Sequence, residues 1–195
     1  MEAKEYIVAM TGASGAILGV KLLEALVKLG LPVHLIVSEG AKETLLEEVG
    51  IKVEELIGLA SFYHEDHILH GPLASGSYIS PSVEAMMVAP CSMKTLAGIA
   101  SGYSSTLVGR AADVILKEGK RLVLVVRESP LSAVHLENML KLARIGVRIV
   151  PPVPPFYQKP ETVGELIDQM VGRILDQAGL HTALTRRWHG KLDKE

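Results

Sequence analysis

Short apolar runs alternate with segments of helical spacing along most of this chain. A short run that is apolar throughout is typical of a strand in a parallel sheet, and apolar residues at every third or fourth position are typical of a helix packed on one side. Strands are predicted at residues 6–10, 33–37, 85–89, 122–126 and 147–150. Helices are predicted between and after them, at residues 17–29, 39–49, 94–100, 107–117, 133–145 and 161–178.

This repeated alternation predicts the α/β class, with a three-layer, Rossmann-like (flavodoxin-like) parallel sheet that has helices on both faces. One domain is expected over residues 1–180, and residues 181–195 are expected to be a polar tail that docks on a neighbour or stays flexible. Residues 57–82 and the proline-rich residues 151–160 fit neither pattern, and irregular loops of such length often have a function.

Composition excludes several classes of protein. The 195 residues are 48% hydrophobic, which suits one domain with a sizeable core. The high mean hydropathy suggests further burial between subunits, although a parallel sheet buried on both faces would raise the same value. The 20 basic and 22 acidic side chains give no charge excess for binding nucleic acid or an anionic membrane. The N-terminal apolar stretch is too short for a signal peptide or a membrane span. Cys91 is the one cysteine, so no intrachain disulfide can form, and we expect a cytoplasmic protein.

The loops after the predicted strands are the candidate site, because parallel strands end at the same edge of their sheet. The first loop, Thr11 to Ala16, contains only small residues. These would let a phosphate approach the backbone amides at the start of the next helix, where the helix dipole favours an anion. The glycine spacing matches neither G-x-G-x-x-G nor a P-loop. The alternative is a tight turn in which Ser14 caps the helix.

The next two loops offer similar chemistry. Ser38 is expected either to cap a helix or to contact a ligand. Glu39, the next residue, could contact a ribose, so a nicotinamide oxidoreductase stays an open alternative. The segment 89–95 places hydroxyls, a lysine and free amides at a helix start, which predicts a second anion site. No histidine is adjacent to Cys91 in the sequence, so we expect a small buried thiol there rather than a nucleophile.

A charged pair, Arg127 and Glu128, directly follows a buried run. Arginine suits a phosphate and glutamate suits proton transfer, although a plain ion pair at the rim of the sheet would give the same pattern. Tyr157, in a proline-stiffened loop, and Arg173, in the last helix, are weaker candidates on physical grounds.

Three histidines lie close together in the sequence but without a zinc-site motif such as C-x-x-C or H-E-x-x-H. We therefore expect surface histidines, and no metal, at His64, His67 and His70.

Five motifs occur in a fixed order: Gly12–Ala16, Ala89–Leu96, Arg127–Leu131, His135–Met139 and Pro155–Tyr157. Together they resemble the UbiX-type flavin prenyltransferases, in register from Tyr6 to about Trp188. The resemblance implies an enzyme with a Rossmann-like sheet, assembled as a homo-dodecamer with its sites between subunits. Reduced FMN would be its substrate rather than a resident cofactor.

The resemblance also implies the reaction. A dimethylallyl group would pass from dimethylallyl phosphate to N5 of reduced FMN, followed by ring closure at C6. The product would be prenylated FMN, the cofactor of UbiD-type decarboxylases. The family needs no metal for this transfer, and both the monophosphate and the diphosphate stay open as the donor.

By position, the resemblance assigns roles to single residues. The residues that would bind FMN are Gly12, Ala13, Ser14, Ser38, Ser92, Met93, Lys94, Thr95 and Arg127. The residues that would bind dimethylallyl phosphate are Tyr157, Arg173 and Trp188. The catalytic residues would be Glu128, Lys117, Ser14 and Glu48. The chain departs from the family pattern at Ser129 and at Pro154–Pro155, and neither departure touches an assigned charge.

Two other activities compete with this interpretation. An FMN-dependent cysteine decarboxylase has a Pro-Ala-Ser-Ala-Asn-Thr type of loop, whereas residues 89–95 lack the asparagine and His67 is the one tempting base. A non-catalytic FMN carrier would need neither Glu128 nor Lys117.

Overall fold

The computed structural model describes residues 4–185 and 187–188, which contain one six-stranded sheet. Its strands are β1 (Glu5–Met10), β2 (Val33–Val37), β3 (Phe62–Glu65), β4 (Val83–Cys91), β5 (Arg121–Val126) and β6 (Arg148–Ile149). All neighbouring strands are parallel, in the order β3-β2-β1-β4-β5-β6. This is the doubly wound order, in which the chain reverses its direction of travel between β1 and β4. The predicted fold class is confirmed.

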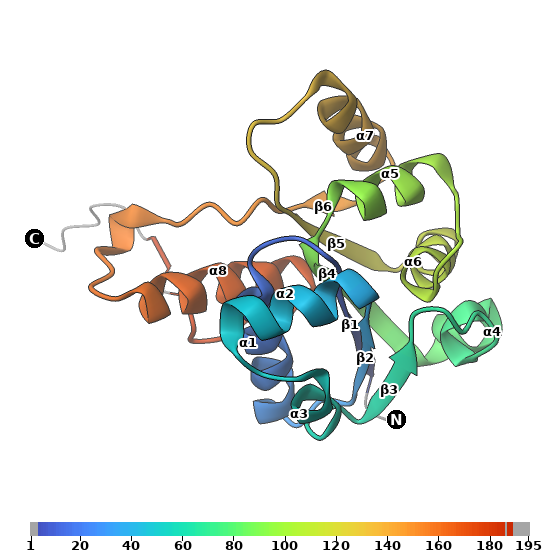
Figure 1. The fold of residues 1–195 in the computed structure, drawn as a ribbon, viewed down its shortest axis with the longest axis horizontal. Coiled ribbons are helices and arrows are strands. Elements are labelled where there is room, and N and C mark those ends of the chain that lie inside the picture. Colours follow the sequence, from blue (N-terminus) through green and yellow to red (C-terminus); the bar gives the residue numbers. More distant parts are fainter. Residues whose placement is uncertain (1–3, 186, 189–195) are drawn as a thin grey trace, which may run out of the picture.

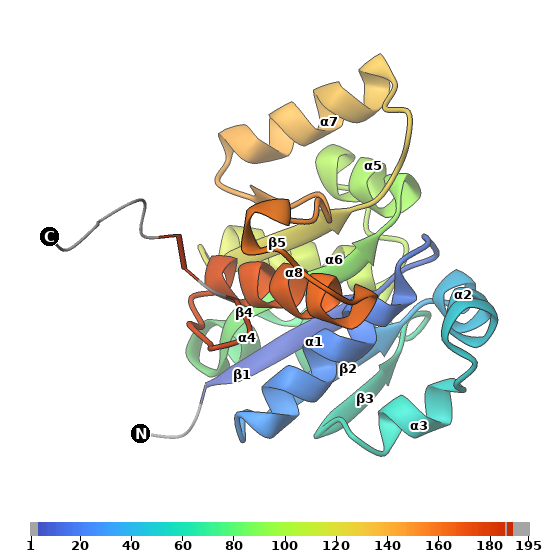
Figure 2. The same ribbon diagram turned by 90° about the vertical axis from the view of Figure 1, so that its left-hand side faces the viewer.

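Two layers of helices cover the sheet (Figures 1 and 2). One layer contains α1 (Ala16–Lys28), α2 (Glu39–Val49), α3 (Val53–Ile57) and α8 (Val163–Gln177). The other contains α4 (Gly76–Ser82), α5 (Met93–Ser101), α6 (Leu107–Lys117) and α7 (Ala133–Arg144). Two 3-10 turns, Pro72–Ala74 and Phe156–Gln158, lie in the connections. Figure 2 shows α1 and α8 in front of the sheet and α4 and α6 behind it.

The central strand shows why the apolar runs are continuous. Tyr6 and Val8 pack against the α1 and α8 layer, and Ile7 and Ala9 pack against the opposite layer. Successive side chains of a strand point to opposite faces, so a strand covered on both sides needs apolar residues at every position. The predicted elements are confirmed to within two residues at each end.

The expectation of an irregular loop at 57–82 is wrong, because this segment contains β3 and α4. β3 is a four-residue edge strand that pairs with β2 on one side through its backbone, with Phe62 opposite His34. Its side chains are partly exposed, so no apolar run reveals it in the sequence. α4 contains Pro81, a residue that argues against a helix when only the sequence is read.

No helix within the described residues is both long and apolar enough to cross a bilayer.

Candidate functional site

The ends of β1, β2, β4 and β5 are tied together at the carboxyl edge of the sheet. Thr11, which is 2% exposed, donates its hydroxyl to the Pro90 carbonyl at 3.0 Å and accepts the Ser92 amide at 2.8 Å. The Arg127 amide donates to the Cys91 carbonyl at 3.2 Å, and the Ser38 amide donates to the Met10 carbonyl at 3.0 Å. The predicted strand-end loops therefore lie together at the point where the strand order reverses, which is where such sheets bind ligands.

Glu48, from the last turn of α2, caps α1. Its carboxylate accepts the backbone amides of Gly15 at 2.8 Å and Ala16 at 3.0 Å. Burial disfavours the charged form, but hydrogen bonds from Ser14 and from these two amides, together with the Arg127 charge, lower the pKa of Glu48 below its usual value. Glu48 is thus a fixed anion at this helix N-terminus.

This arrangement bears on two expectations about the first loop. The Gly15 and Ala16 amides are not free for the expected phosphate contact, since the Glu48 carboxylate occupies them. Ser14 is also not the helix cap, because Gly15 is the N-cap residue, with a left-handed φ of 102° that favours glycine. Ser14 instead bonds to Glu48. What the loop offers a ligand is small, partly exposed backbone at Gly12 and Ala13.

The start of α5 fits an anion better. Ser92 is its N-cap, and the serine hydroxyl accepts the Thr95 amide at 3.3 Å and donates to the Thr95 hydroxyl at 3.1 Å. The amides of Met93 and Lys94 come before that of Thr95, in the first turn, where an α-helix has no internal partners for them. No acidic residue occupies this turn, so amides, hydroxyls and the exposed Lys94 side chain suit a phosphate group.

Two neighbouring features complete the ligand-facing edge. Ser38 caps α2 by accepting the Ala41 amide at 3.3 Å, as one of its two predicted roles requires. Gly12 approaches Gly40 so closely that a side-chain carbon at Gly12 would lie 3.1 Å from the Gly40 backbone. A larger residue at Gly12 would therefore push the first loop away from α2.

The thiol of Cys91 lies in the core and is not a nucleophile. It is fully buried below the α5 start, and burial raises its pKa to about 12. Because the thiolate is the reactive form, a thiol of this kind is inert near neutral pH. The prediction of a buried thiol is confirmed.

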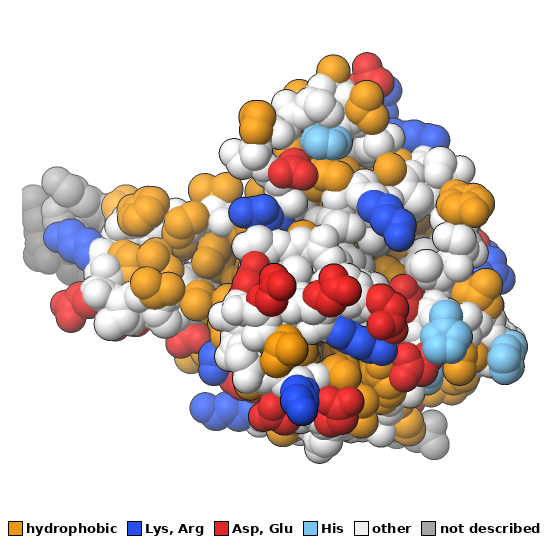
Figure 3. All heavy atoms as spheres, in the orientation of Figure 1, with side chains coloured by type: hydrophobic (Ala, Val, Ile, Leu, Met, Phe, Trp, Pro, Cys, Tyr) orange, Lys and Arg blue, Asp and Glu red, His pale blue; other side chains and the backbone are white. Residues whose placement is uncertain are grey.

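Arg127 and Glu128 lie at the rim, and both are exposed. A Glu128 carboxylate oxygen accepts the Ser129 amide at 3.0 Å, which fixes the carboxylate beside the strand end. Arg127 interacts electrostatically with Glu48, and no ion pair between Arg127 and Glu128 is found among the described residues. Figure 3 shows acidic side chains over α2 and basic side chains between α2 and the α5–α7 region.

A pocket of about 380 Å³ adjoins this edge on the β6 side. Its walls are the proline-rich segment after β6 and one face of α8, which include Tyr157 and Arg173. The Trp188 ring lies edge-on to that of Tyr157, with centroids 5.5 Å apart. The three residues predicted to bind the second substrate therefore lie together, although the sequence separates them by up to thirty-one positions.

Lys117 lies elsewhere within the chain. It ends α6 just before β5 begins, whereas Glu128 follows the end of β5, so the length of this six-residue strand, about 20 Å, separates them. The Lys117 ammonium binds Glu118 at 2.8 Å and lies beside the start of α4 at Gly76. A single chain does not bring Lys117 to the strand-end loops.

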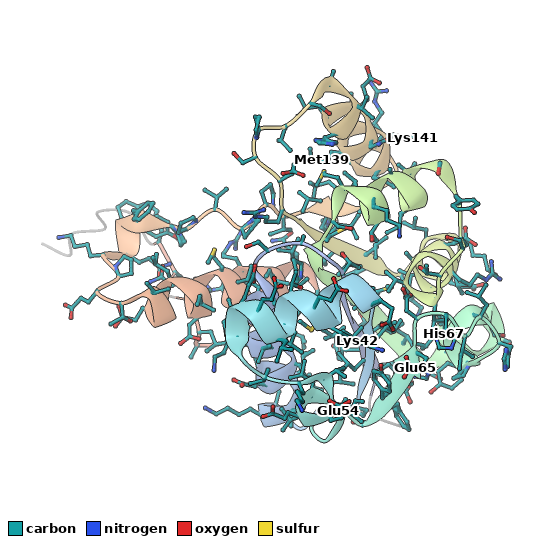
Figure 4. All side chains as sticks on the ribbon, viewed as in Figure 1. Lys42, Glu54, Glu65, His67, Met139 and Lys141 are labelled. Atoms are coloured by element: carbon teal, nitrogen blue, oxygen red, sulfur yellow. The ribbon has the colours of Figure 1, made fainter. Side chains whose placement is uncertain are left out.

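The three clustered histidines do not converge on a point. His64 lies in β3 and bonds to His34 of β2 at 2.9 Å; burial, and then the nearby His34, lower the pKa of His64. His67 and His70 are exposed, and Figure 4 shows His67 beyond the Glu65 end of β3. Within the described part of the chain, no group of three or more His, Cys, Asp or Glu side chains is arranged to hold a metal ion.

A doubly wound parallel sheet whose reversal point presents capped helix starts, an arginine and a glutamate defines a nucleotide-binding α/β protein. The family model described as Flavoprotein matches residues 1–175. A probable UbiX-like flavin prenyltransferase from Streptomyces sp. (strain D7) is 51% identical over 94% of this chain and 91% of its own length. Flavin prenyltransferase UbiX from Methanocaldococcus jannaschii is 46% identical over 94% of this chain and 98% of its own. The chain therefore belongs to the flavoprotein family and, within it, to the UbiX-like flavin prenyltransferases.

Solved structures agree with this assignment. The crystal structure of AnUbiX (PadA1) in complex with FMN and dimethylallyl pyrophosphate has a TM-score of 0.93 and 46% identity, and covers 97% of this chain and 99% of that one. A dodecameric FMN-dependent UbiX-like decarboxylase from Escherichia coli O157:H7 has a TM-score of 0.91 and 51% identity over 95% of this chain and 100% of that one. The FMN-dependent cysteine decarboxylase TvaF, at 15% identity and a TM-score of 0.64, shares the fold alone.

Sequence reasoning missed two residues that support the predicted site residues. Thr11 begins the first loop, but its role as the hydrogen-bonded link between β1 and β4 depends on tertiary contacts. Asp176 was not singled out, although it bonds to Arg173 at 2.9 Å. An Arg-x-x-Asp spacing on a helix was the available signal, and it is common on ordinary helix surfaces.

Proposed function

We propose that this chain joins a dimethylallyl group to reduced FMN, with the allylic phosphate as leaving group. The observation that supports this best is the adjacency of two anion-binding features at one sheet edge. The start of α5 suits the flavin phosphate, and the pocket with Tyr157 and Arg173 suits the phosphate of the donor. The related AnUbiX structure contains FMN and dimethylallyl pyrophosphate together.

The strand-end loops would hold the flavin. The α5 residues Ser92–Thr95 and the side chain of Arg127 would bind and orient the phosphate-bearing end, with Ser38 beside them. The small residues Gly12 and Ala13 would let the flat ring approach the backbone closely. When bound, reduced FMN supplies the nucleophilic N5 and then C6.

The charged side chains would act on the donor. As the allylic C–O bond breaks, its electron pair leaves with the phosphate, and Arg127 and Arg173 would stabilise that negative charge. Glu128 would give a proton to the departing phosphate and later accept one from the flavin carbon. The rings of Tyr157 and Trp188 would shield the positive prenyl carbon from water.

Ser14 and Glu48 have a supporting part in this proposal. The Ser14 hydroxyl bonds to the Glu48 carboxylate, whose charge is held in place by the α1 amides and by Arg127. The pair would orient Arg127 and offer a fixed negative charge near the reacting atoms.

Lys117 would enter the site from a second subunit, since it lies at the opposite edge of its own sheet. Residues 1–180 would then form one FMN-binding domain in a homo-dodecamer with sites between subunits. Of the tail 181–195, residues 181–185 and 187–188 dock on α8 and near Tyr157. Residues 186 and 189–195 lie outside the described residues, as do residues 1–3 of the domain.

The proposed product is prenylated FMN, and the proposed consumer is a UbiD-type decarboxylase. The proposed compartment is the cytoplasm, on the ground that Cys91 is the one cysteine and is a buried thiol.

The test is to incubate the protein with reduced FMN and either dimethylallyl monophosphate or diphosphate, and then weigh the flavin. We expect a gain of one prenyl unit with at least one donor. Glu128→Ala and Lys117→Ala should still bind FMN but lose about a hundredfold or more in turnover, the usual loss when an acid–base group is removed. Flavin that binds but keeps its mass with both donors would refute the activity and favour the carrier, and full turnover by Glu128→Ala would refute the acid–base role of Glu128. Loss of flavin absorbance on adding a cysteinyl peptide would favour the cysteine decarboxylase.

A further inference from the structure

One nearly buried carboxylate near the end of α8 binds three basic side chains. The Asp176 side chain is 4% exposed. Its Oδ2 accepts from Arg173 Nη1 at 2.9 Å and from Arg187 Nη1 at 2.6 Å. Its Oδ1 accepts from Arg187 Nη2 at 2.6 Å and from His181 Nδ1 at 3.0 Å. The reaction proposed above gives Asp176 no role.

These contacts join two parts of the chain at the donor pocket. Arg173 lines the pocket, and Arg187 belongs to the tail that follows α8. The two-pronged contact of Arg187 fixes its orientation, because both prongs of the planar guanidinium are engaged. The next residue, Trp188, is 69% exposed and meets Tyr157 of the pocket wall at an interplanar angle of 76°. Asp176 is therefore the point at which the tail is fastened beside the pocket.

We propose that Asp176 is a positioning residue for the dimethylallyl phosphate, which holds Arg173 in its binding orientation and fastens the tail so that Trp188 stands at the pocket rim. The inference rests on the proposed function, since it takes the pocket beside Tyr157 as the donor site. It adds a residue that touches neither substrate and acts through two that would.

The charges allow this role. Arg173 uses Nη1 for Asp176, and a guanidinium has five N–H donors, so the others stay available for a phosphate. Arg173 and Arg187 together outweigh the single negative charge of Asp176, so the group keeps a positive charge that attracts an anion. Without Asp176, the donor phosphate would have to order Arg173 and the tail itself, and that cost would appear as weaker binding.

The test compares Asp176→Asn with Asp168→Asn, an exposed aspartate on the same helix. Calorimetry of FMN-loaded protein gives the Kd of dimethylallyl monophosphate, and turnover gives KM and kcat. Trp188 is the only tryptophan, so fluorescence anisotropy of the flavin-free protein reports the mobility of the tail. For Asp176→Asn we expect Kd and KM for the donor to rise about tenfold, the size of a lost charged hydrogen bond, with a smaller change in kcat. Anisotropy should fall and FMN affinity should not change, and Asp168→Asn should match the parent protein in every measurement.

A second variant, Arg187→Gln, releases the tail but leaves the contact between Asp176 and Arg173 in place. We expect a similar fall in anisotropy with a smaller rise in donor Kd, and a double variant no worse than Asp176→Asn alone, because both changes break one cluster. If Asp176→Asn does not fold, Arg187→Gln tests the proposal through the same two measurements, the anisotropy of Trp188 and the Kd of the donor.

Two results would overturn the inference. If Asp176→Asn lowers the anisotropy but leaves the donor Kd unchanged, Asp176 holds the tail in place without positioning the donor. If the anisotropy is unchanged, Asp176 does not fasten the tail. Failure of the proposed function would look different, since the parent protein would then bind the donor without changing the mass of FMN. The ratio of donor Kd between Asp176→Asn and the parent would still test the role of Asp176. A parent protein that binds no donor would refute both.

Discussion

At the scale of single residues, the Glu48 carboxylate shapes the site as much as the hydrogen-bond donors that stay free for a ligand. Glu48 accepts the Gly15 and Ala16 amides at the start of α1, so these two are not free for a phosphate, whereas α5 has only its serine cap. The two strand-end loops thus acquire different roles, because the first of them meets a carboxylate from a neighbouring helix. This directs an incoming phosphate to Ser92–Thr95.

Glu48 should make stability depend on pH. Its folded pKa lies below the usual 4.5, so on acidification the unfolded chain takes up the proton first. The stabilisation is therefore complete above about pH 4.5 and is lost as pH falls through the folded pKa. Compared with the parent, Glu48→Gln should cost about 0.5 kcal/mol at pH 7, a value kept small by solvent screening at this exposed position. This corresponds to a fall of roughly 2 °C in Tm.

Thermal melts of both proteins at pH 7 and pH 3 check this expectation. The gap between the two melting temperatures should be narrower at pH 3 than at pH 7, because below about pH 4.5 the unfolded chain gains a proton at Glu48 that the folded carboxylate takes up less readily. A gap that stayed constant across this range would show that the carboxylate charge does not stabilise α1.

At the scale of elements, the distance between α1 and the sheet decides whether the strand ends can form a site. α1 crosses the β1 and β4 junction at Gly19, where an added side-chain carbon would collide with the Ala89 carbonyl and lie 2.8 Å from the Met10 side chain. The backbone of the helix therefore rests almost directly on the strands. Because the first loop joins β1 to α1, this contact also sets how far the loop lies from the sheet.

Gly19→Ala should accordingly destabilise the protein, because the backbone carbonyl of Ala89 cannot move aside cheaply. We expect a loss of about 2 kcal/mol in the free energy of unfolding, as for other overpacked cores, and weaker FMN binding as α1 shifts. Gly164→Ala, on an exposed part of α8 where the added carbon would make only an ordinary contact with the Thr162 hydroxyl at 3.7 Å, should be neutral or slightly stabilising. Denaturant unfolding and flavin titration measure both effects, and equal stability of the two variants would contradict the packing account.

At the scale of the whole molecule, the two groups of predicted catalytic residues lie at opposite edges of one sheet. Glu128 is at the carboxyl edge and Lys117 at the amino edge. α7 also exposes several large apolar side chains that a lone chain would leave in water: Val134, Leu136 and Leu140. Both facts favour an assembly in which one chain completes the site of another.

Mixing inactive subunits tests this arrangement. Chains with Lys117→Ala and chains with Glu128→Ala, unfolded together and reassembled in equal amounts, should regain activity, since about a quarter of random interfaces would pair two intact contributions. Each variant reassembled alone is the control, and size exclusion must show oligomers well above the 21.0 kDa chain. No recovery in mixed oligomers would mean that both residues act within one subunit.

The sequence by itself determined the α/β class, the central strands, most helices and the family. These depend on local patterns: a strand buried on both faces must be apolar throughout, a helix must be apolar at every third or fourth position, and ligand loops keep their small residues next to strand ends. β3 and α4 lacked such patterns, because an edge strand needs only backbone partners and Pro81 obscured the helix.

Only the tertiary structure decided which groups meet. Glu48 reaches the α1 amides across thirty-two positions, and Lys117 is separated from Glu128 although they stand eleven apart. Asp176 forms ion pairs with Arg173, which lies in α8, and with Arg187, which lies in the tail. The physical reason is that hydrogen bonds and charges act between atoms a few ångströms apart, and chain order does not specify those distances until the sheet has placed its loops.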